Sequence, residues 1–168
     1  NVAVQYCIAC NRLPYDRPSY EHELDLLRQW GQYTGERQVY LWLYYTFPRE
    51  IAANGRFNCF PGYFAHALGE QFRLSHEYGY RGMFHCGYGQ DVEAYLTYKL
   101  MDDPTLDVDA LLGEYFSGLY GPAAEALQAF YLEVERIYGD PQSYPPEIAS
   151  GRLATHHHQT EELAWGWL

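Results

Sequence analysis

Short apolar runs and longer segments with helical periodicity alternate along the first half of the chain. The apolar runs cover residues 2–10, 38–45 and 81–86, and their lengths predict three β-strands. Apolar residues recur three or four positions apart in residues 19–34 and 62–78, which indicates two amphipathic helices. Such alternation is typical of parallel βαβ units. We therefore expect an α/β fold with three parallel, neighbouring strands and both helices on the outer face of the sheet.

The side chains of these elements define an expected core. The second run is apolar throughout, as in parallel strands that are covered on both faces. The expected apolar stripe of the first helix consists of Tyr20, Leu24, Leu27, Trp30 and Tyr33. The stripe of the second helix consists of Phe64, Leu68 and Phe72. The loop of residues 47–62 is longer than most connections in compact domains, which favours a functional role.

The rest of the chain is expected to be helical. Asp107 is placed to cap a helix, and Gly121-Pro122 separates that helix from the next. The expected stripe of the capped helix is Val108, Leu111, Leu112, Tyr115, Phe116 and Leu119. The expected stripe of the next helix is Ala123, Ala126, Leu127, Phe130, Val134, Ile137 and Tyr138. The pattern thus predicts a mixed region, residues 1–90, and a helical region, residues 91–168, whose last helix is truncated at its end.

Both ends of the chain resemble interior segments. The chain begins without Met on a strand-like run, and it ends on the apolar cluster Trp165-Gly166-Trp167-Leu168. We therefore expect further residues of the same protein at both ends, and the missing remainder of the chain as a partner of this segment. A signal peptide would then lie outside the segment, so secretion or a periplasmic location stays open.

Charge and hydropathy exclude several classes of partner. The net charge is −11, which argues against nucleic acid and against an anionic membrane surface, because both require clusters of Lys and Arg. No apolar run approaches the length of a membrane span.

Aromatic residues and cysteines add chemical detail. The chain holds 18 Tyr, 8 Phe and 4 Trp, and Tyr and Trp offer the flat apolar faces and polar edges that suit sugar rings. Cys7 and Cys10 stand three positions apart on a strand and point to opposite faces, so they cannot converge on one ion. We expect buried thiols there, loop or helix-start positions for His156-His157-His158, and neither a metal nor a cofactor.

Several sequence runs resemble the bacterial DUF4838 family. The most specific stretch is Asp-Pro-x-Leu-Asp-Val-Asp-Ala-Leu-Leu within residues 98–112, followed by Tyr-Gly-Pro-Ala-Ala at residues 120–124. Upstream, Trp42-Leu43-Tyr44 and the Gly-Tyr-Arg-Gly-Met-Phe run of residues 79–84 are also similar to the family. The resemblance implies a glycoside-hydrolase-like (β/α)8 TIM-type barrel with a helical extension, in which residues 1–90 hold the last barrel strands.

The resemblance has one departure at a functional position. Family members often carry an acidic residue just after the strand that ends this motif, whereas here the segment reads His85-Cys86-Gly87-Tyr88 and the only acid is Asp91. Members with known activity act on glycans, so the resemblance implies a glycan or oligosaccharide partner. Glycosidic cleavage requires two carboxylates, and none of the three predicted strands ends in Asp or Glu. The main catalytic carboxylates are therefore expected on earlier strands.

The strand ends nevertheless offer candidate site residues. Asp91 and His85 are weak catalytic candidates, although Asp91 could instead cap a helix and His85 could be a structural hydrogen-bond partner. Aromatic and polar side chains at the strand ends form an expected substrate-binding wall that consists of Asn11, Trp42, Tyr44, Tyr45, His85 and Tyr88. Trp42 lies two residues before Tyr44, on the same side and one layer deeper, and both could instead belong to a barrel core.

These observations lead to a hypothesis and an alternative. The chain is expected to be part of a glycoside hydrolase, in which it supplies part of the sugar-binding wall and is inactive by itself. The alternative is a non-catalytic carbohydrate-binding protein on the same barrel fold, because the fold does not determine the activity.

Overall fold

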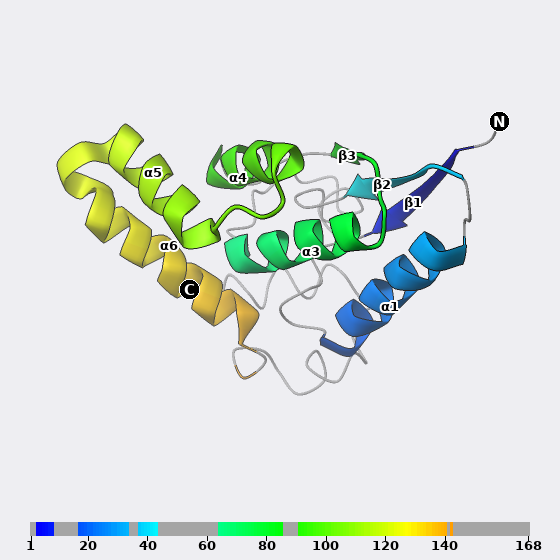
Figure 1. The fold of residues 1–168 in the computed structure, drawn as a ribbon. Helices are drawn as coiled ribbons and strands as arrows, with labels where there is room; N and C mark the ends of the chain where they lie inside the picture. Colours follow the sequence, from blue (N-terminus) through cyan, green and yellow to red (C-terminus); the bar gives the residue numbers. More distant parts are fainter. Residues whose placement is uncertain are drawn as a thin grey trace, which may run out of the picture.

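A computed structural model of the protein describes residues 3–8, 17–33, 37–43, 64–85, 91–140 and 142. These residues form a mostly helical α/β structure with one small parallel sheet (Figure 1). The elements in chain order are β1 (Val4–Ile8), α1 (Arg17–Tyr33), β2 (Val39–Leu43), α3 (Ala65–Glu77), β3 (Met83–His85), α4 (Asp91–Asp102), α5 (Val108–Tyr120), the 3-10 helix η2 (Gly121–Ala123) and α6 (Ala124–Gly139).

The three predicted strands are parallel neighbours in the order β1-β2-β3, which confirms the prediction from the apolar runs. Cys7 pairs with Trp42, and Trp42 pairs in turn with Phe84 on β3. Each strand begins one or two residues later than the run that predicted it. The part of the wall formed by Asn11, Tyr44, Tyr45 and Tyr88 lies outside the described residues.

Both α1 and α3 cover the same face of the sheet (Figure 1). Val39, Leu41 and Leu43 on β2 point to this face and are buried, while the alternating residues of β2 are only half-buried. Leu27 of α1 and Phe72 of α3 line one interior space together with the β2 leucines. The face of β2 under the helices is therefore more deeply buried than the opposite face, and cover on both faces stays a prediction.

The apolar stripe of α1 is narrower than the sequence predicted. Tyr20 and Leu27 are buried, but Trp30 is 38% exposed and Tyr33 is 85% exposed. Gly31 explains how α1 docks, because a Cβ atom at this position would lie 2.5 Å from the backbone oxygen of Tyr78, just after α3. Trp30 lies at the edge of the α1–sheet contact, where its ring packs near Tyr6 of β1.

Helices α4, α5 and α6 pack around a second set of buried apolar side chains. Leu96 and Leu100 of α4 and Leu112 and Phe116 of α5 are fully buried. Asp107 caps α5 as predicted, since its carboxylate accepts a hydrogen bond from the backbone N–H of Ala110 at 2.7 Å. The predicted stripes were again too wide, because Leu119 and Phe130 are exposed.

His66 links α3 to the α5–α6 pair. Its Nδ1 lies 2.7 Å from Oε2 of Glu135 on α6, and its Nε2 lies 3.2 Å from Oδ1 of Asp109 on α5. Its backbone N–H also donates to Oε1 of Glu135 at 2.8 Å. The hydrogen bond to Glu135 is the main cause that raises the pKa of His66 to about 9. The imidazolium form is therefore held between two carboxylates at neutral pH.

The buried apolar residues form one cluster that includes residues on both sides of position 90. This shared cluster does not decide whether regions 1–90 and 91–168 are separate domains, so that division stays a prediction. None of the helices in the described parts of the chain is long and apolar enough to cross a membrane.

Candidate functional site

The sheet face opposite α1 and α3 carries an aromatic pair. The rings of Trp42 and Phe84 lie 4.5 Å apart between centroids, at an interplanar angle of 54°. Strand register places Cys7 beside Trp42 on this face, and alternation places Tyr40 there as well. We call this surface, formed by Cys7, Tyr40, Trp42 and Phe84, the Trp42 face. Phe84 is 49% exposed, so the pair presents accessible aromatic surface.

Cys7 and His85 depart from the arrangement that the sequence suggested. Cys7 is exposed, whereas a buried thiol was expected. His85 pairs in register with Leu43, so it points to the helix-covered side of the sheet and away from Trp42. Both ring nitrogens of His85 are shielded from solvent, and its role as acid, base or structural hydrogen-bond partner stays a prediction. The strand register, rather than the position at a strand end, determines on which face of the sheet a side chain lies.

Asp91 is the first residue of α4, and its side chain is exposed. A carboxylate in the first helical turn is stabilised by the helix dipole, so the position has a structural rationale whatever its further role. Glu93 stands in the same turn but is completely buried, together with Thr97 one turn later. Two carboxyl groups with opposite environments therefore lie at the start of α4, just beyond β3 in the chain.

Three tyrosines surround Phe116 beside this end of α4. The ring of Phe116 lies 5.3 Å from Tyr131 and 5.9 Å from Tyr120, and Tyr115 lies 6.3 Å from Tyr120. We call Tyr115, Tyr120 and Tyr131 the tyrosine cluster. They come from α5 and α6, so only the assembly of three helices brings them near Asp91.

The carboxyl groups of α4 influence the pKa values of two tyrosines in the cluster. Burial is the main cause that raises the pKa of Tyr115 to about 12, and the neighbouring Tyr120 and the charge of Asp91 add to it. Burial also raises the pKa of Tyr131, with contributions from Tyr120, Asp91 and Glu93. The phenol groups of Tyr115 and Tyr131 therefore stay protonated at neutral pH and can donate hydrogen bonds.

Sequence reasoning assigned Tyr115 to a core stripe and did not consider Tyr120, Tyr131 or Glu93 as site residues. The available signal was the density of tyrosines in the two helices that follow Asp91. In the described residues, no group of three His, Cys, Asp or Glu side chains is arranged to hold a metal ion.

Comparison with known families gives one match. The model of the family described as a domain of unknown function, DUF4838, matches residues 1–133. Comparison with curated proteins and with solved structures gave no match. The family match covers β1 through most of α6, and so includes the Trp42 face and the tyrosine cluster.

Proposed function

The chain belongs to the DUF4838 family, and from this premise we propose that it is part of a carbohydrate-active protein, a glycoside hydrolase on a (β/α)8 barrel. The observation that carries the proposal is the Trp42–Phe84 pair on the sheet face that α1 and α3 leave uncovered. In a barrel this face points to the interior, and chemistry occurs at the carboxyl ends of the strands. Trp42 and Phe84 lie in those ends of β2 and β3.

The Trp42 face supplies the apolar half of sugar recognition. A pyranose has a flat face of C–H groups that packs on an aromatic ring, and such a contact buries area that water solvates poorly. The four predicted wall residues beyond the described strands, Asn11, Tyr44, Tyr45 and Tyr88, would extend this surface with hydroxyl and amide groups.

In this proposal the tyrosine cluster and Asp91 supply the polar contacts with the sugar. Neutral phenol groups donate to sugar oxygens, and the Asp91 carboxylate accepts from sugar hydroxyls. In this proposal Asp91 holds substrate, while the two carboxylates that cleave the glycosidic bond lie outside the described residues. The 168-residue chain by itself is then expected to bind sugar without hydrolysing it.

A non-catalytic carbohydrate-binding protein is the second candidate. It is favoured by one observation, namely that none of the described strands ends in Asp or Glu. The Trp42 face and the tyrosine cluster would serve sugar binding equally well without cleavage.

An activity assay separates the two candidates. The intact protein and its Asp91→Asn variant are tested with aryl β-glycosides, with Asp102→Asn as a control on a second exposed aspartate of α4. The hydrolase predicts turnover, and Asp91→Asn raises KM while kcat changes little, because Asp91 holds the substrate. Sugar binding without turnover would favour the binding protein. A loss of kcat of about 100-fold or more in Asp91→Asn would contradict the assigned role and make Asp91 a catalytic acid or base.

A further inference from the structure

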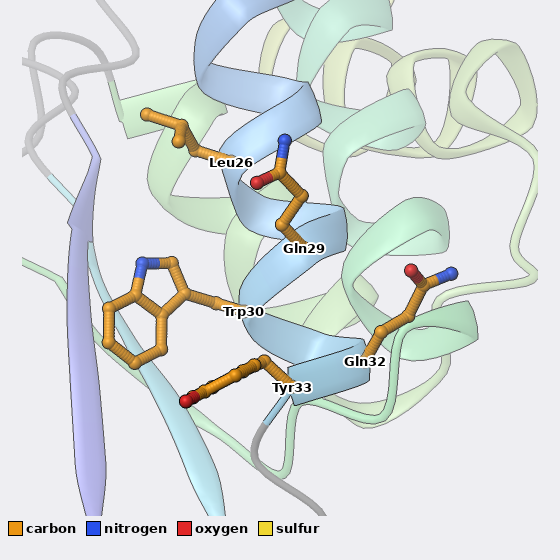
Figure 2. A pocket seen from close by; sticks show the side chains of 5 residues that line it. All are labelled: Leu26, Gln29, Trp30, Gln32 and Tyr33. Carbon is orange, nitrogen blue, oxygen red and sulfur yellow. The ribbon is translucent and has the colours of Figure 1, made fainter.

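A groove of about 480 Å³ runs along the C-terminal half of α1, on the flank that does not face the core. Its lining consists of Leu26, Gln29, Trp30, Gln32 and Tyr33 (Figure 2). Figure 2 shows the rings of Trp30 and Tyr33 projecting from α1 on the side where the strands run. This groove is separate from the Trp42 face, because α1 covers the opposite side of the sheet.

Aromatic rings from two elements form one wall of the groove. The Trp30 and Tyr33 centroids lie 6.4 Å apart at an interplanar angle of 85°, which makes an open corner. Tyr6 of β1 lies 6.5 Å from Trp30 and supports its other side. Tyr33 is almost fully exposed and Trp30 partly so. Trp30 is thus positioned between Tyr6 and Tyr33 with part of its indole ring open to solvent, where the flat face of a ligand can pack on it.

The polar groups in the groove are uncharged. Gln29 and Gln32 bring side-chain amides, and Tyr33 adds a hydroxyl group. The amide nitrogen of Gln29 donates to Oδ2 of Asp25 at 2.5 Å, which fixes the position of this amide at the edge of the groove. The described part of the lining contains no Lys, Arg, Asp or Glu, and the charged group at its edge is the Asp25 carboxylate. This wall therefore suits a neutral ligand with hydroxyl groups better than a phosphate or a carboxylate.

We propose that this groove is an accessory saccharide site, in which a neutral pyranose packs against Trp30 and Tyr33 and bonds to Gln29 and Gln32. The volume falls within the range of small-ligand pockets, about 300–1,000 Å³. A protein partner fits less well, because the lining spans two helical turns, whereas a stable interface uses roughly 20–30 residues on each side. The site is independent of the Trp42 face and goes beyond the proposed function.

The test follows the indole N–H signal of Trp30 by nuclear magnetic resonance. The signal is assigned as the one that is missing from the spectrum of the Trp30→Phe variant. The intact chain is titrated with β-linked glucose and mannose oligomers of two to six units. We expect a saturable shift of this signal, with an affinity that falls about tenfold in Tyr33→Ala. Tyr33 is so exposed that its removal leaves the fold intact. Tyr98→Ala, which removes another exposed tyrosine, on α4, is the matched control and leaves the affinity unchanged.

Three results would overturn the accessory site. They are a Trp30 signal that does not move with any oligomer, an unchanged affinity in Tyr33→Ala, and self-association of the chain that Trp30→Ala abolishes. The accessory site and the Trp42 face are tested independently. Phe84→Ala changes the Trp42 face and is expected to leave the ligand-induced shift of the Trp30 signal unchanged.

Discussion

The sheet region, made of β1–β3 with α1 and α3, and the helical region of α4–α6 contribute different chemistry. The sheet region exposes aromatic rings, as in the Trp42–Phe84 pair, and offers few charges beside them. The helical region brings carboxyl and phenol groups together, at Asp91 and the tyrosine cluster. The difference teaches that local strand alternation places the aromatic rings on one sheet face, whereas the grouping of the phenol and carboxyl groups depends on how three helices assemble. Mutations that disturb the helical assembly should therefore damage the polar half alone.

The largest expected effect is the loss of packing in the helical region. Leu112 is fully buried, and Leu112→Ala should lower the free energy of unfolding by about 2–5 kcal/mol through lost burial and a cavity. Leu119→Ala on the exposed side of the same helix is the control and should cost less than about 0.5 kcal/mol. Urea denaturation followed by circular dichroism measures both. Equal losses in the two variants would show that α5 is packed differently from this description.

The next largest effect concerns the docking of α1 in the sheet region. A Cβ atom at Gly31 would lie 2.5 Å from the backbone oxygen of Tyr78, so Gly31→Ala should destabilise the protein by about 1–3 kcal/mol. Gly113→Ala in α5 meets nothing within 4 Å and should instead stabilise by about 0.5–1 kcal/mol through helix propensity. Thermal unfolding of the two variants gives shifts of opposite sign. A stabilising Gly31→Ala would mean that α1 does not approach Tyr78 closely.

A smaller effect should appear in the pH dependence of the free energy of unfolding, through the contacts of His66 that link α3 to the α5–α6 pair. The pKa of His66 is raised from 6.5 to about 9 in the folded chain, so its contribution is full below about pH 6.5 and is lost as the pH rises through 9. The side chain is about half exposed, and solvent screening reduces the gain to about 1 kcal/mol. Unfolding measured from pH 6 to 10 should show this loss in the wild type and little of it in His66→Gln. If the free energy of unfolding changes in parallel with pH in the wild type and in His66→Gln, the contacts of His66 contribute nothing to stability.

Sequence reasoning recovered those features that depend on local patterns. The apolar runs identified three parallel strands, and the position of Asp107 identified a helix cap, because both follow from short-range periodicity and capping. Family membership was also visible in the runs around Asp107 and Tyr120.

Features that depend on packing between elements were not recovered. Helical periodicity shows that Trp30 and Tyr33 could join a stripe, but it does not show how α1 docks on the sheet, and in the structure both stay exposed. His85 stands at a strand end as predicted, yet the register with Leu43 turns it to the helix side. Glu93 has the sequence character of a surface residue and is nevertheless buried, because it lies on the face of α4 that packs inward together with Leu96 and Thr97.

The central claim is that the Trp42 face binds sugar, and the indole N–H signal of Trp42 tests it most directly. The intact chain and Phe84→Ala are titrated with neutral β-linked oligosaccharides, with Tyr98→Ala as the control. The account predicts a saturable Trp42 shift whose affinity falls by about 1 kcal/mol, roughly fivefold, in Phe84→Ala, the scale of one aromatic contact. A Trp42 signal that does not respond, or an affinity that Phe84→Ala leaves unchanged, would contradict the account.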